Sequence, residues 1–374
     1  MLPALMNSPR KGVGRPSVLL DMRPLQGPSS ARGVGAYARG LLSGLIENGF
    51  DRNLTLLLDA AFDTPALPVG EYKLAGCRRR SHGQLAAYED AVALAADIQR
   101  IGPDVYHAID FHLPGQSPVP LVVTLHDLIP WAWGGSRMRG ERVRYWIFRR
   151  LLRRADIVLA VSSATAEDAV RLRVSSRQRI RVVPEAAGPA FSPRAGAAQH
   201  VKHRWGMEKP YLLFVGALDA RKDPASLLRA WAVARENHPE LQLMLAGDPG
   251  PQAPKRMPGA YLLGRVDDDG LAELYSAAAC LPFPSRYEGF GLPCLEAMAC
   301  GCPVAAFSNS SLPEVVDDAG MLVPDGDADA LGRAAAEMIR APERWRQAGL
   351  RRARQFSWAK TAREVISAYE AVLR

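Results

Sequence analysis

The sequence contains little cysteine, with 5 cysteines among 374 residues. No two of them are spaced as C-x-x-C, and no pair of histidines completes a zinc-binding pattern. Scattered thiols in odd number argue against a disulfide framework, so we expect a reduced cytosolic protein with buried thiols. The five are Cys77, Cys280, Cys294, Cys300 and Cys302.

The sequence also lacks a long hydrophobic run. Its longest stretch without a charged residue, from Ala297 to Pro313, is interrupted by Gly301, Pro303 and several serines, and would not form a membrane-spanning helix. No apolar segment typical of a secretory signal follows the first methionine. We therefore expect a cytoplasmic protein that is either soluble or peripheral on the inner face of the membrane.

An excess of positive charge is found in only one half of the chain. The net charge is +8, and residues 1–188 carry 25 Lys and Arg against 17 Asp and Glu. Residues 189–374 carry 22 of each sign, because the whole chain has 47 basic and 39 acidic residues. A basic half suits an anionic surface such as phospholipid, lipid-linked phosphate or nucleic acid. We expect the two halves to meet different partners.

Short apolar runs alternate with amphipathic segments along most of the chain. A hydrophobic share of 48% and a charged share of 23% are typical of a globular protein, and 374 residues are enough for two domains. Strands are predicted at 17–21, 54–58, 104–107, 121–125 and 157–161, then at 211–215, 242–246, 261–263, 280–283 and 303–305. Helices are predicted at 35–47, 84–101 and 138–154, then at 224–237, 269–277, 293–299, 328–339 and 358–373. Such alternation predicts parallel sheets covered on both faces, and two series predict two doubly wound α/β domains.

The domain boundary is expected near residues 188–198, which are rich in Gly, Pro, Ser and Ala. Residues 1–16 show no periodicity and are predicted to be a flexible tail. We expect one Rossmann-like domain at 17–188 and a second at 189–355. Residues 356–374 hold the last predicted helix.

The segment from Pro284 to Glu296 carries the most chemical information. Two glutamates, Glu288 and Glu296, stand eight residues apart, with a glycine turn between them that leads into a helix with Pro293 in its first turn. Backbone N–H groups at such a helix start can bind a diphosphate, while the glutamates accept hydrogen bonds from sugar hydroxyls. A capped turn with solvated carboxylates explains the same residues equally well.

This segment resembles the E-x7-E signature of family 4 glycosyltransferases, which are retaining enzymes with the GT-B fold. The resemblance extends over nearly the whole chain, through the segments 214–223, 245–248, 264–268 and 356–358. It implies two Rossmann-like domains that face each other across a cleft, with the donor in the second domain and the acceptor in the first. It also implies that the last helix crosses back onto the first domain.

The resemblance implies roles for four charged residues of the second domain. Arg221 and Lys222 would neutralise the diphosphate of the nucleotide sugar and so stabilise the departing nucleotide. Glu296 would hold the ribose hydroxyls, and Glu288 would hold hydroxyls of the transferred sugar. A basic pair on a surface loop is the alternative for Arg221 and Lys222.

Further donor contacts are implied at the neighbouring turns. Backbone N–H groups around Phe290, Gly291 and Leu292 would face sugar and phosphate. Val266 would contact the base, and Asp268 would bind a guanine edge unless it caps the following helix. The donor site would also include Gly216. Many family members have an arginine after this glycine, and this chain has Ala217, a version that resembles enzymes of O-antigen-type polysaccharide synthesis and favours GDP-mannose.

In the first half, the resemblance directs attention to a glycine pair and to a histidine. Gly33 and Gly35 stand between the first strand and the first helix, where glycine lets the backbone approach a donor closely, although a simple turn explains them too. His126 ends an apolar strand, and ligands of parallel sheets bind beyond such ends. It would hydrogen-bond the transferred sugar or orient the acceptor, and a structural histidine is the alternative. His107 and His112 are candidates for acceptor contacts.

No carboxylate of the first domain stands out as a nucleophile. The resemblance implies front-face transfer, in which the leaving phosphate helps to take the proton of the acceptor, so catalysis is mainly positioning and charge stabilisation. Two D-x-D patterns, at 267–269 and 325–327, could supply metal ligands, but helix capping and turn formation explain both. We expect no cofactor and no required metal.

Eight arginines lie between Arg137 and Arg154, with Trp146 and Phe148 among them. Such a helix can lie on an anionic membrane, and a solvated face with aromatics in the core fits equally well. No nucleic-acid-binding module is present, so we expect no nucleic-acid partner.

Together these features predict a retaining, metal-independent hexosyltransferase of cell-surface glycan synthesis. Its partners would be a nucleotide sugar, best GDP-mannose, and a saccharide or lipid-linked acceptor. A UDP-sugar-dependent enzyme, a phosphorylase or sugar-phosphate transferase, and a non-catalytic nucleotide-sugar-binding protein are the alternatives.

Overall fold

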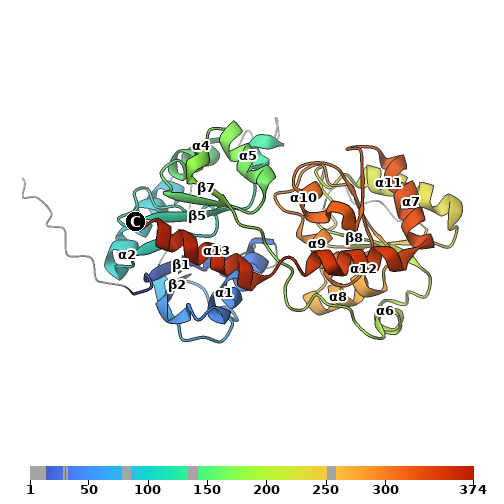
Figure 1. Ribbon diagram of the computed structural model, residues 1–374, viewed down its shortest axis with the longest axis horizontal. Helices are drawn as coiled ribbons and strands as arrows, with labels where there is room; N and C mark the ends of the chain where they lie inside the picture. Colours follow the sequence, from blue (N-terminus) through green and yellow to red (C-terminus); the bar gives the residue numbers. More distant parts are fainter. Residues whose placement is uncertain (1–13, 28–29, 31–32, 78–85, 134–141, 251–257) are drawn as a thin grey trace, which may run out of the picture.

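The computed structural model describes residues 14–27, 30, 33–77, 86–133, 142–250 and 258–374. The chain forms two α/β lobes that lie side by side, and its last helix returns to the first lobe (Figure 1). We call them the N-terminal lobe, built on residues 18–182, and the C-terminal lobe, built on residues 197–353. Most of the predicted tail, residues 1–13, lies outside the described residues, as do residues 84–85 and 138–141 of two predicted helices.

The N-terminal lobe contains a seven-stranded sheet in the order β3-β2-β1-β4-β5-β6-β7, and every pair of neighbouring strands is parallel. Five of these strands coincide with predicted ones to within one residue at each end, and β3 and β7 were not predicted. Both are edge strands with partly exposed side chains, so neither shows an apolar run. The strands are β1 (Val18–Asp21), β2 (Leu54–Asp59), β3 (Lys73–Cys77), β4 (Val105–Ala108), β5 (Leu121–Leu125), β6 (Ile157–Ala160) and β7 (Ile180–Val182).

Helices cover both faces of this sheet because alternate strand residues point to opposite sides. Leu20, Leu56 and Val122 belong to the core shared with α1 and α13, whereas Leu57 and Val123 pack with α2 and α4. The helices are α1 (Gly33–Glu47), α2 (Ala86–Ile101), α3 (Ile129–Ala132), α4 (Arg142–Leu152) and α5 (Ser163–Arg171), with 3-10 turns η1 (Arg23–Gln26), η3 (Asp51–Asn53) and η5 (Arg177–Arg179).

The C-terminal lobe has two three-stranded ladders, β10-β9-β8 and β11-β12-β13. The N–H of Leu213 donates to the carbonyl of Cys280 at 3.0 Å, and the N–H of Ala279 donates to that of Tyr211 at 3.0 Å. These bonds join β8 to β11, so the ladders act as one parallel sheet. The strands are β8 (Tyr211–Val215), β9 (Gln242–Ala246), β10 (Ala260–Gly264), β11 (Leu281–Phe283), β12 (Val304–Phe307) and β13 (Met321–Val323).

Capping side chains fix the starts of several helices of the C-terminal lobe. Asp223, Asp267 and Asp327 each accept a backbone N–H at the start of α7, α8 and α11. α6, α10 and α12 were not predicted. The helices are α6 (Ala197–Trp205), α7 (Pro224–Asn237), α8 (Asp268–Ala277), α9 (Leu292–Ala299), α10 (Leu312–Val316), α11 (Ala328–Arg340) and α12 (Pro342–Ala353), with the 3-10 turn η6 (Asp317–Ala319).

The last helix, α13 (Trp358–Ala371), packs on α1 of the N-terminal lobe. An ideal Cβ on Gly44 would lie 2.2 Å from the carbonyl oxygen of Trp358, so only glycine permits this approach. Tyr369 also forms a 2.6 Å hydrogen bond with Nδ1 of the buried His107. The chain therefore crosses between the lobes twice, once before α6 and once before α13 (Figure 1).

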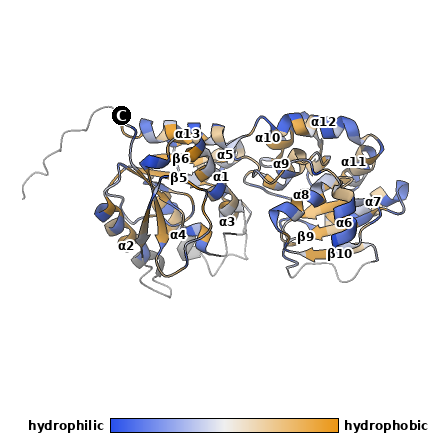
Figure 2. Cartoon of the chain, turned by 90° about the horizontal axis from the view of Figure 1, so that it is seen from below, coloured by the Kyte–Doolittle hydropathy of each residue, from blue (hydrophilic) through white to orange (hydrophobic). Residues whose placement is uncertain are grey.

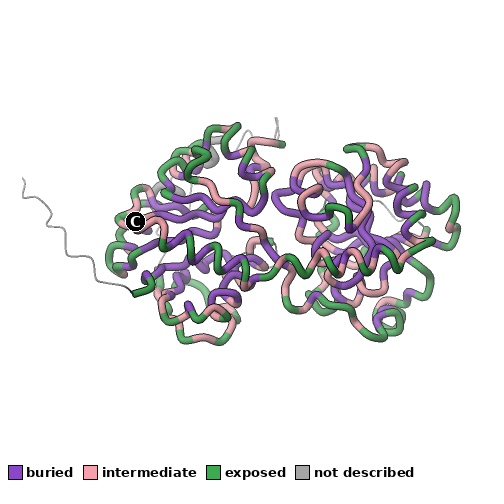
Figure 3. Tube along the Cα trace, in the orientation of Figure 1, coloured by how far each residue is buried: buried purple, intermediate pink, exposed green. Residues whose placement is uncertain are grey.

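Apolar residues are concentrated in the strands and on the inner faces of the helices (Figure 2). The same segments are the buried ones (Figure 3), as expected for parallel sheets covered on both sides. The five cysteines are all free and buried, and buried thiols were predicted. Among the described residues, no helix is long and apolar enough to span a membrane.

Candidate active site

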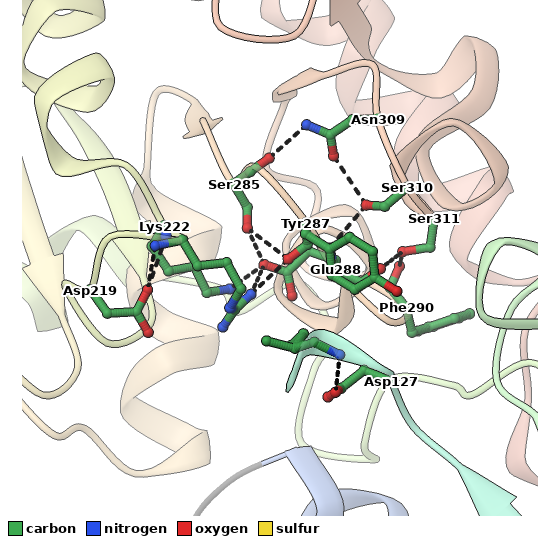
Figure 4. Close-up of polar contacts among 12 residues, drawn as sticks. Asp127, Asp219, Lys222, Ser285, Tyr287, Glu288, Phe290, Asn309, Ser310 and Ser311 are labelled. Atoms are coloured by element: carbon green, nitrogen blue, oxygen red, sulfur yellow. Dashed lines mark hydrogen bonds and ion pairs between the residues drawn. The ribbon is translucent and has the colours of Figure 1, made fainter. Parts of the chain in front are cut away.

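Three charged side chains from two segments meet in the C-terminal lobe. Oε1 of Glu288 accepts hydrogen bonds from Nη1 of Arg221 at 2.8 Å and from Nζ of Lys222 at 2.6 Å. Ser285 donates a further hydrogen bond to the same oxygen (Figure 4). The structure thus brings together three of the residues that the sequence singled out.

Aspartates shape the loop that carries the two cations. The backbone N–H groups of Arg221 and Lys222 both donate to Oδ1 of Asp219, at 2.9 and 3.0 Å. Asp223 has a positive φ of 47° and caps α7, which begins with Pro224. This turn holds the basic pair at the carboxyl end of β8, on the side where parallel sheets bind ligands.

The cluster is buried, and burial decides how its charges behave. Burial alone would raise the pKa of Glu288, but the positive charges of Lys222 and Arg221 hold it below its ordinary value. Burial lowers the pKa of Lys222, and Glu288 offsets only part of that effect. Two cations therefore share one carboxylate, an arrangement that a bound anion would stabilise.

A glycine turn connects Glu288 to α9. Gly291 has φ 103°, which disfavours other residues, and it stands at the N-cap position of α9. The hydroxyl of Ser311 donates to the carbonyl of Phe290 at 2.7 Å, and that of Ser310 accepts the N–H of Glu288 at 2.9 Å. Sequence reasoning missed these serines. Both lie directly before α10, and they belong to no motif.

Two of the predicted glycines lie beside this turn. An ideal Cβ on Gly33, in the N-terminal lobe, would lie 3.9 Å from Cδ1 of Leu292, the first residue of α9. Gly216 has φ 142°, and an ideal Cβ there would lie 3.3 Å from Cε of Lys222. The second residue of the pair, Gly35, is buried within α1.

Glu296 lies on α9 and is hydrogen-bonded outside the Glu288 cluster. Oε2 accepts a 3.4 Å hydrogen bond from the hydroxyl of Tyr275, and burial together with the charge of Asp268 raises the pKa of Glu296 to about 8. Asp268 is exposed and is the first residue of α8, whose cap is Asp267. The alternative that Asp268 is the helix cap is therefore wrong. Val266, the predicted base contact, is partly buried next to it.

Both D-x-D patterns are used structurally, as the capping interpretation predicts. Asp267 caps α8 and Asp327 caps α11. Asp269 pairs with Arg194 at 2.7 Å, and Asp325 accepts from the side chain of Asn309 at 2.7 Å. Within the described residues, no group of three or more His, Cys, Asp or Glu side chains could hold a metal ion.

The Glu288 segment also contacts the N-terminal lobe directly. The hydroxyls of Ser162 and Thr165, at the start of α5, donate to the carbonyl of Gly289 at 2.5 and 3.1 Å. The carboxylate of Glu314, on α10, accepts the N–H groups of Ser163 at 2.8 Å and Ala164 at 3.0 Å. α5 therefore joins the two lobes next to the charged cluster.

His126 lies at this border, but its ring is engaged within the protein. Nδ1 is 3.0 Å from Oε1 of Glu185 and Nε2 is 3.0 Å from the carbonyl oxygen of Ile109. Burial would lower the pKa of His126, yet the hydrogen bond and charge of Glu185 raise it. With 14% of its side chain exposed, His126 would have to exchange one of these bonds in order to bind a sugar.

The prediction that His107 contacts the acceptor is wrong. This side chain is fully buried, bonded to Tyr369 and to Thr124, and burial lowers its pKa to about 3. It is a neutral core histidine that anchors α13. Its sequence context, a polar residue in an apolar strand, does not distinguish this role from ligand binding.

Sequence reasoning also missed Asp127, the residue after His126. It lies next to the Glu288 segment, and the charges of Arg221 and Glu288 act on its carboxyl group. Figure 4 shows it below Glu288, on the strand end of the N-terminal lobe. Its position at the carboxyl end of β5 was the signal available in the sequence.

Two family models match the chain. The model described as Glycosyltransferase Family 4 matches residues 31–187, and the one described as Glycosyl transferases group 1 matches residues 197–355. O-antigen chain mannosyltransferase B of Escherichia coli is 29% identical, over 94% of this chain and 99% of its own length. A D-inositol 3-phosphate glycosyltransferase of Salinispora tropica is 30% identical, over 77% of this chain and 68% of its own length.

Solved structures share the arrangement of the lobes. Sucrose-phosphate synthase of Thermosynechococcus elongatus superposes with a TM-score of 0.74 at 23% identity, covering 95% of this chain and 98% of that one. HepE of Anabaena, in complex with UDP and glucose, superposes with a TM-score of 0.69 at 18% identity, covering 95% and 100%. At these identities the likeness concerns the fold.

Proposed function

This chain belongs to the family 4 glycosyltransferases, and on that premise we propose that it transfers mannose from GDP-mannose to a saccharide or lipid-linked saccharide with retention of configuration. The family and the GT-B fold expected from the sequence are confirmed, as is the assignment as a glycosyltransferase. The donor, the acceptor and the residue roles are the proposal.

The observation that carries the proposal is a pair of cations at the carboxyl end of β8, of which Lys222 is buried and Arg221 partly buried. Arg221 and Lys222 share the single carboxylate of Glu288, next to the glycine turn that begins α9. A donor diphosphate would supply the missing negative charge and accept N–H groups of the turn. Glu288 would then exchange part of its ion pairing for hydroxyls of the transferred sugar.

The nucleoside would extend from this cluster toward α8. Glu296 would bind the ribose, and Val266 and the exposed Asp268 would contact the base. An aspartate can accept two N–H groups of a guanine edge, which suits GDP. The mannosyltransferase from Escherichia coli named above supports the choice of mannose.

Catalysis would consist of holding the sugar–phosphate bond in position and stabilising the negative charge that forms when it breaks. Arg221 and Lys222 would stabilise the negative charge that develops on the departing diphosphate, which would also take the proton of the attacking hydroxyl. Front-face attack would preserve the configuration of the sugar. Two positive side chains would do the work that a divalent cation does elsewhere, so no metal would be required.

A UDP-sugar is the second candidate donor. HepE, which shares the fold, was solved with UDP and glucose. The Arg221–Lys222 pair would bind either diphosphate equally, so the choice depends on Val266 and Asp268.

The test is a turnover assay with GDP-mannose, UDP-glucose and ADP-glucose in EDTA, with mannobiose and synthetic lipid-linked mannosides as acceptors. We expect nucleotide release from GDP-mannose that rises with acceptor, and an α-linked product by NMR. Preference for UDP-glucose selects the second donor. Release of GMP in place of GDP indicates a sugar-phosphate transferase, and release of mannose 1-phosphate from mannobiose when inorganic phosphate is added indicates a phosphorylase. Binding without turnover across the panel indicates a non-catalytic binding protein.

Membrane association through the arginine-rich stretch is a separate part of the proposal. In α4, Trp146 is 62% exposed and Arg150 is exposed as well, and the exposed Arg153 follows the end of the helix. A tryptophan flanked by arginines suits an anionic surface. Cosedimentation with vesicles of phosphatidylglycerol should exceed that with phosphatidylcholine and fall in Trp146→Ser, and equal recovery from both vesicles would contradict this part.

A further inference from the structure

Asp127 occupies the border between the lobes without an assigned role. Asp127 follows β5, and an ideal Cβ placed on Gly289 would lie 2.9 Å from the Cβ of Asp127. The Glu288–Gly289 segment therefore packs directly against it (Figure 4). A carboxylate at this place faces the donor side from the N-terminal lobe.

The Asp127 carboxylate has few bonds within the protein. Among the residues that the structure describes, its hydrogen-bond donor is the N–H of Ile129, 2.9 Å from Oδ1. Glu288 by contrast receives hydrogen bonds from three side chains, and Glu185 is bonded to His126. A partly buried carboxylate is stabilised by each hydrogen-bond donor that it gains. Asp127 can therefore accept a further hydrogen bond from a ligand.

The charges that act on Asp127 indicate what it faces. They are those of His126 on its own strand end, and of Arg221 and Glu288 in the opposite lobe. Under the proposed function, Arg221 holds the diphosphate and Glu288 holds the sugar. A group within electrostatic reach of both lies near the bond that joins sugar to phosphate, which is the bond that breaks.

We infer that Asp127 binds the attacking hydroxyl of the saccharide acceptor. This inference rests on the proposed function. The second carboxylate oxygen accepts the hydroxyl's hydrogen bond, while the Ile129 N–H holds the first, so a lone pair of the hydroxyl is oriented toward the anomeric carbon. As the new glycosidic C–O bond forms and the sugar–phosphate bond breaks, the hydroxyl proton leaves its hydrogen bond to Asp127 and passes to the departing phosphate oxygen, so Asp127 ends the step as the carboxylate that began it.

Asp127→Asn is the direct test because it preserves size and leaves an oxygen for the Ile129 N–H. The amide presents an N–H group at the place where the carboxylate accepts the O–H of the acceptor, so the hydroxyl loses its orientation. With GDP-mannose and mannobiose, we expect kcat/KM for mannobiose to fall by about a hundredfold, the KM for GDP-mannose to change less than about threefold, and the ratio of transfer to donor hydrolysis to fall by at least about tenfold.

Two further variants make the outcome interpretable. Asp127→Ala should lose transfer in the same way, with GDP binding retained by calorimetry as the sign that it folds. Asp97→Asn alters a carboxylate that pairs with Arg100 on the surface of α2 and should behave as wild type. Equal loss of hydrolysis and transfer, with a raised KM for GDP-mannose, would assign Asp127 to the transferred sugar and overturn the inference, as would unchanged transfer. If the wild type neither binds GDP nor turns over GDP-mannose, the proposed function itself fails.

Discussion

The two lobes contribute to the candidate site in different ways. The C-terminal lobe supplies residues from two short segments, 216–222 and 288–296, and joins their charges before any ligand binds. The N-terminal lobe supplies single residues from the ends of separate strands and helices, such as His126, Ser162 and Thr165. A donor site that is local in sequence can be read from a motif, whereas a surface assembled by tertiary packing cannot.

Removing Glu288 should have the largest effect. Glu288→Ala leaves the buried Lys222 and the partly buried Arg221 beside each other without their shared carboxylate, which we expect to lower the free energy of unfolding by about 3–5 kcal/mol. Urea denaturation measures this loss. Adding GDP should recover part of it, because the diphosphate replaces the missing charge.

Glu288→Gln serves as the matched variant, since it keeps the shape and one acceptor oxygen. It should be more stable than Glu288→Ala and still transfer at least about a hundredfold more slowly than wild type. An alanine variant as stable as wild type would show that the charged cluster of the C-terminal lobe is not preassembled.

Adding a methyl group at Gly289 should separate the lobes and should affect transfer more than nucleotide binding. An ideal Cβ there would lie 1.9 Å from the carbonyl oxygen of His126, so the two segments must move apart. We expect Gly289→Ala to lower kcat for transfer by about a hundredfold while the Kd for GDP changes less than about threefold.

The control for Gly289→Ala is Gly27→Ala, where an added Cβ meets nothing within 4 Å. It should transfer at the wild-type rate. Full activity in Gly289→Ala would contradict the view that the observed contact between the lobes belongs to the active arrangement.

The pH dependence of stability should reveal Glu296. The pKa of Glu296 is raised from 4.5 to about 8, so between these values the folded chain holds a proton that the unfolded chain has released. The free energy of unfolding therefore falls as pH rises through this window. Relative to wild type, Glu296→Gln should gain roughly 1–3 kcal/mol between pH 5 and 8, measured by urea denaturation.

Glu364→Gln, at an exposed position of α13, is the control for this series and should follow the wild type at every pH. A constant difference between Glu296→Gln and wild type would mean that Glu296 titrates normally.

Chelation should have the smallest effect. Because Arg221 and Lys222 carry the charge that would otherwise need a divalent cation, EDTA should change the transfer rate less than about twofold. Loss of activity that Mn²⁺ restores would contradict this prediction.

Much of the fold follows from the sequence because buried parallel strands are nearly continuous apolar runs. The three missed strands, β3, β7 and β13, lie at sheet edges, where partial exposure removes that signal. α5 was missed for a related reason, since it is short, and its N-cap Ser162 and its Thr165 bond to the other lobe while only small apolar residues, Ala166 and Ala169, are buried.

The residues of the candidate site also fall into two groups, those that the sequence predicted and those that only the packing reveals. Glu288 was predicted from the E-x7-E segment, and Arg221 and Lys222 from the resemblance of residues 214–223 to the same family, and the structure joins all three. His107 and His126 look alike in sequence, each at the end of an apolar strand, and only packing shows that Tyr369 and Thr124 enclose the first while Glu185 binds the second. Asp127 was overlooked because its neighbours, Arg221 and Glu288, lie far along the chain.

Calorimetric titration of GDP into the metal-free wild type and into Lys222→Ala tests the central claim most directly, namely that Arg221 and Lys222 at the end of β8 hold the donor diphosphate. Lys360→Ala, an exposed lysine of α13, is the matched control. The account predicts that GDP binds the wild type and the control alike, and that Lys222→Ala weakens binding by about a hundredfold. Equal affinity in Lys222→Ala and wild type would contradict it.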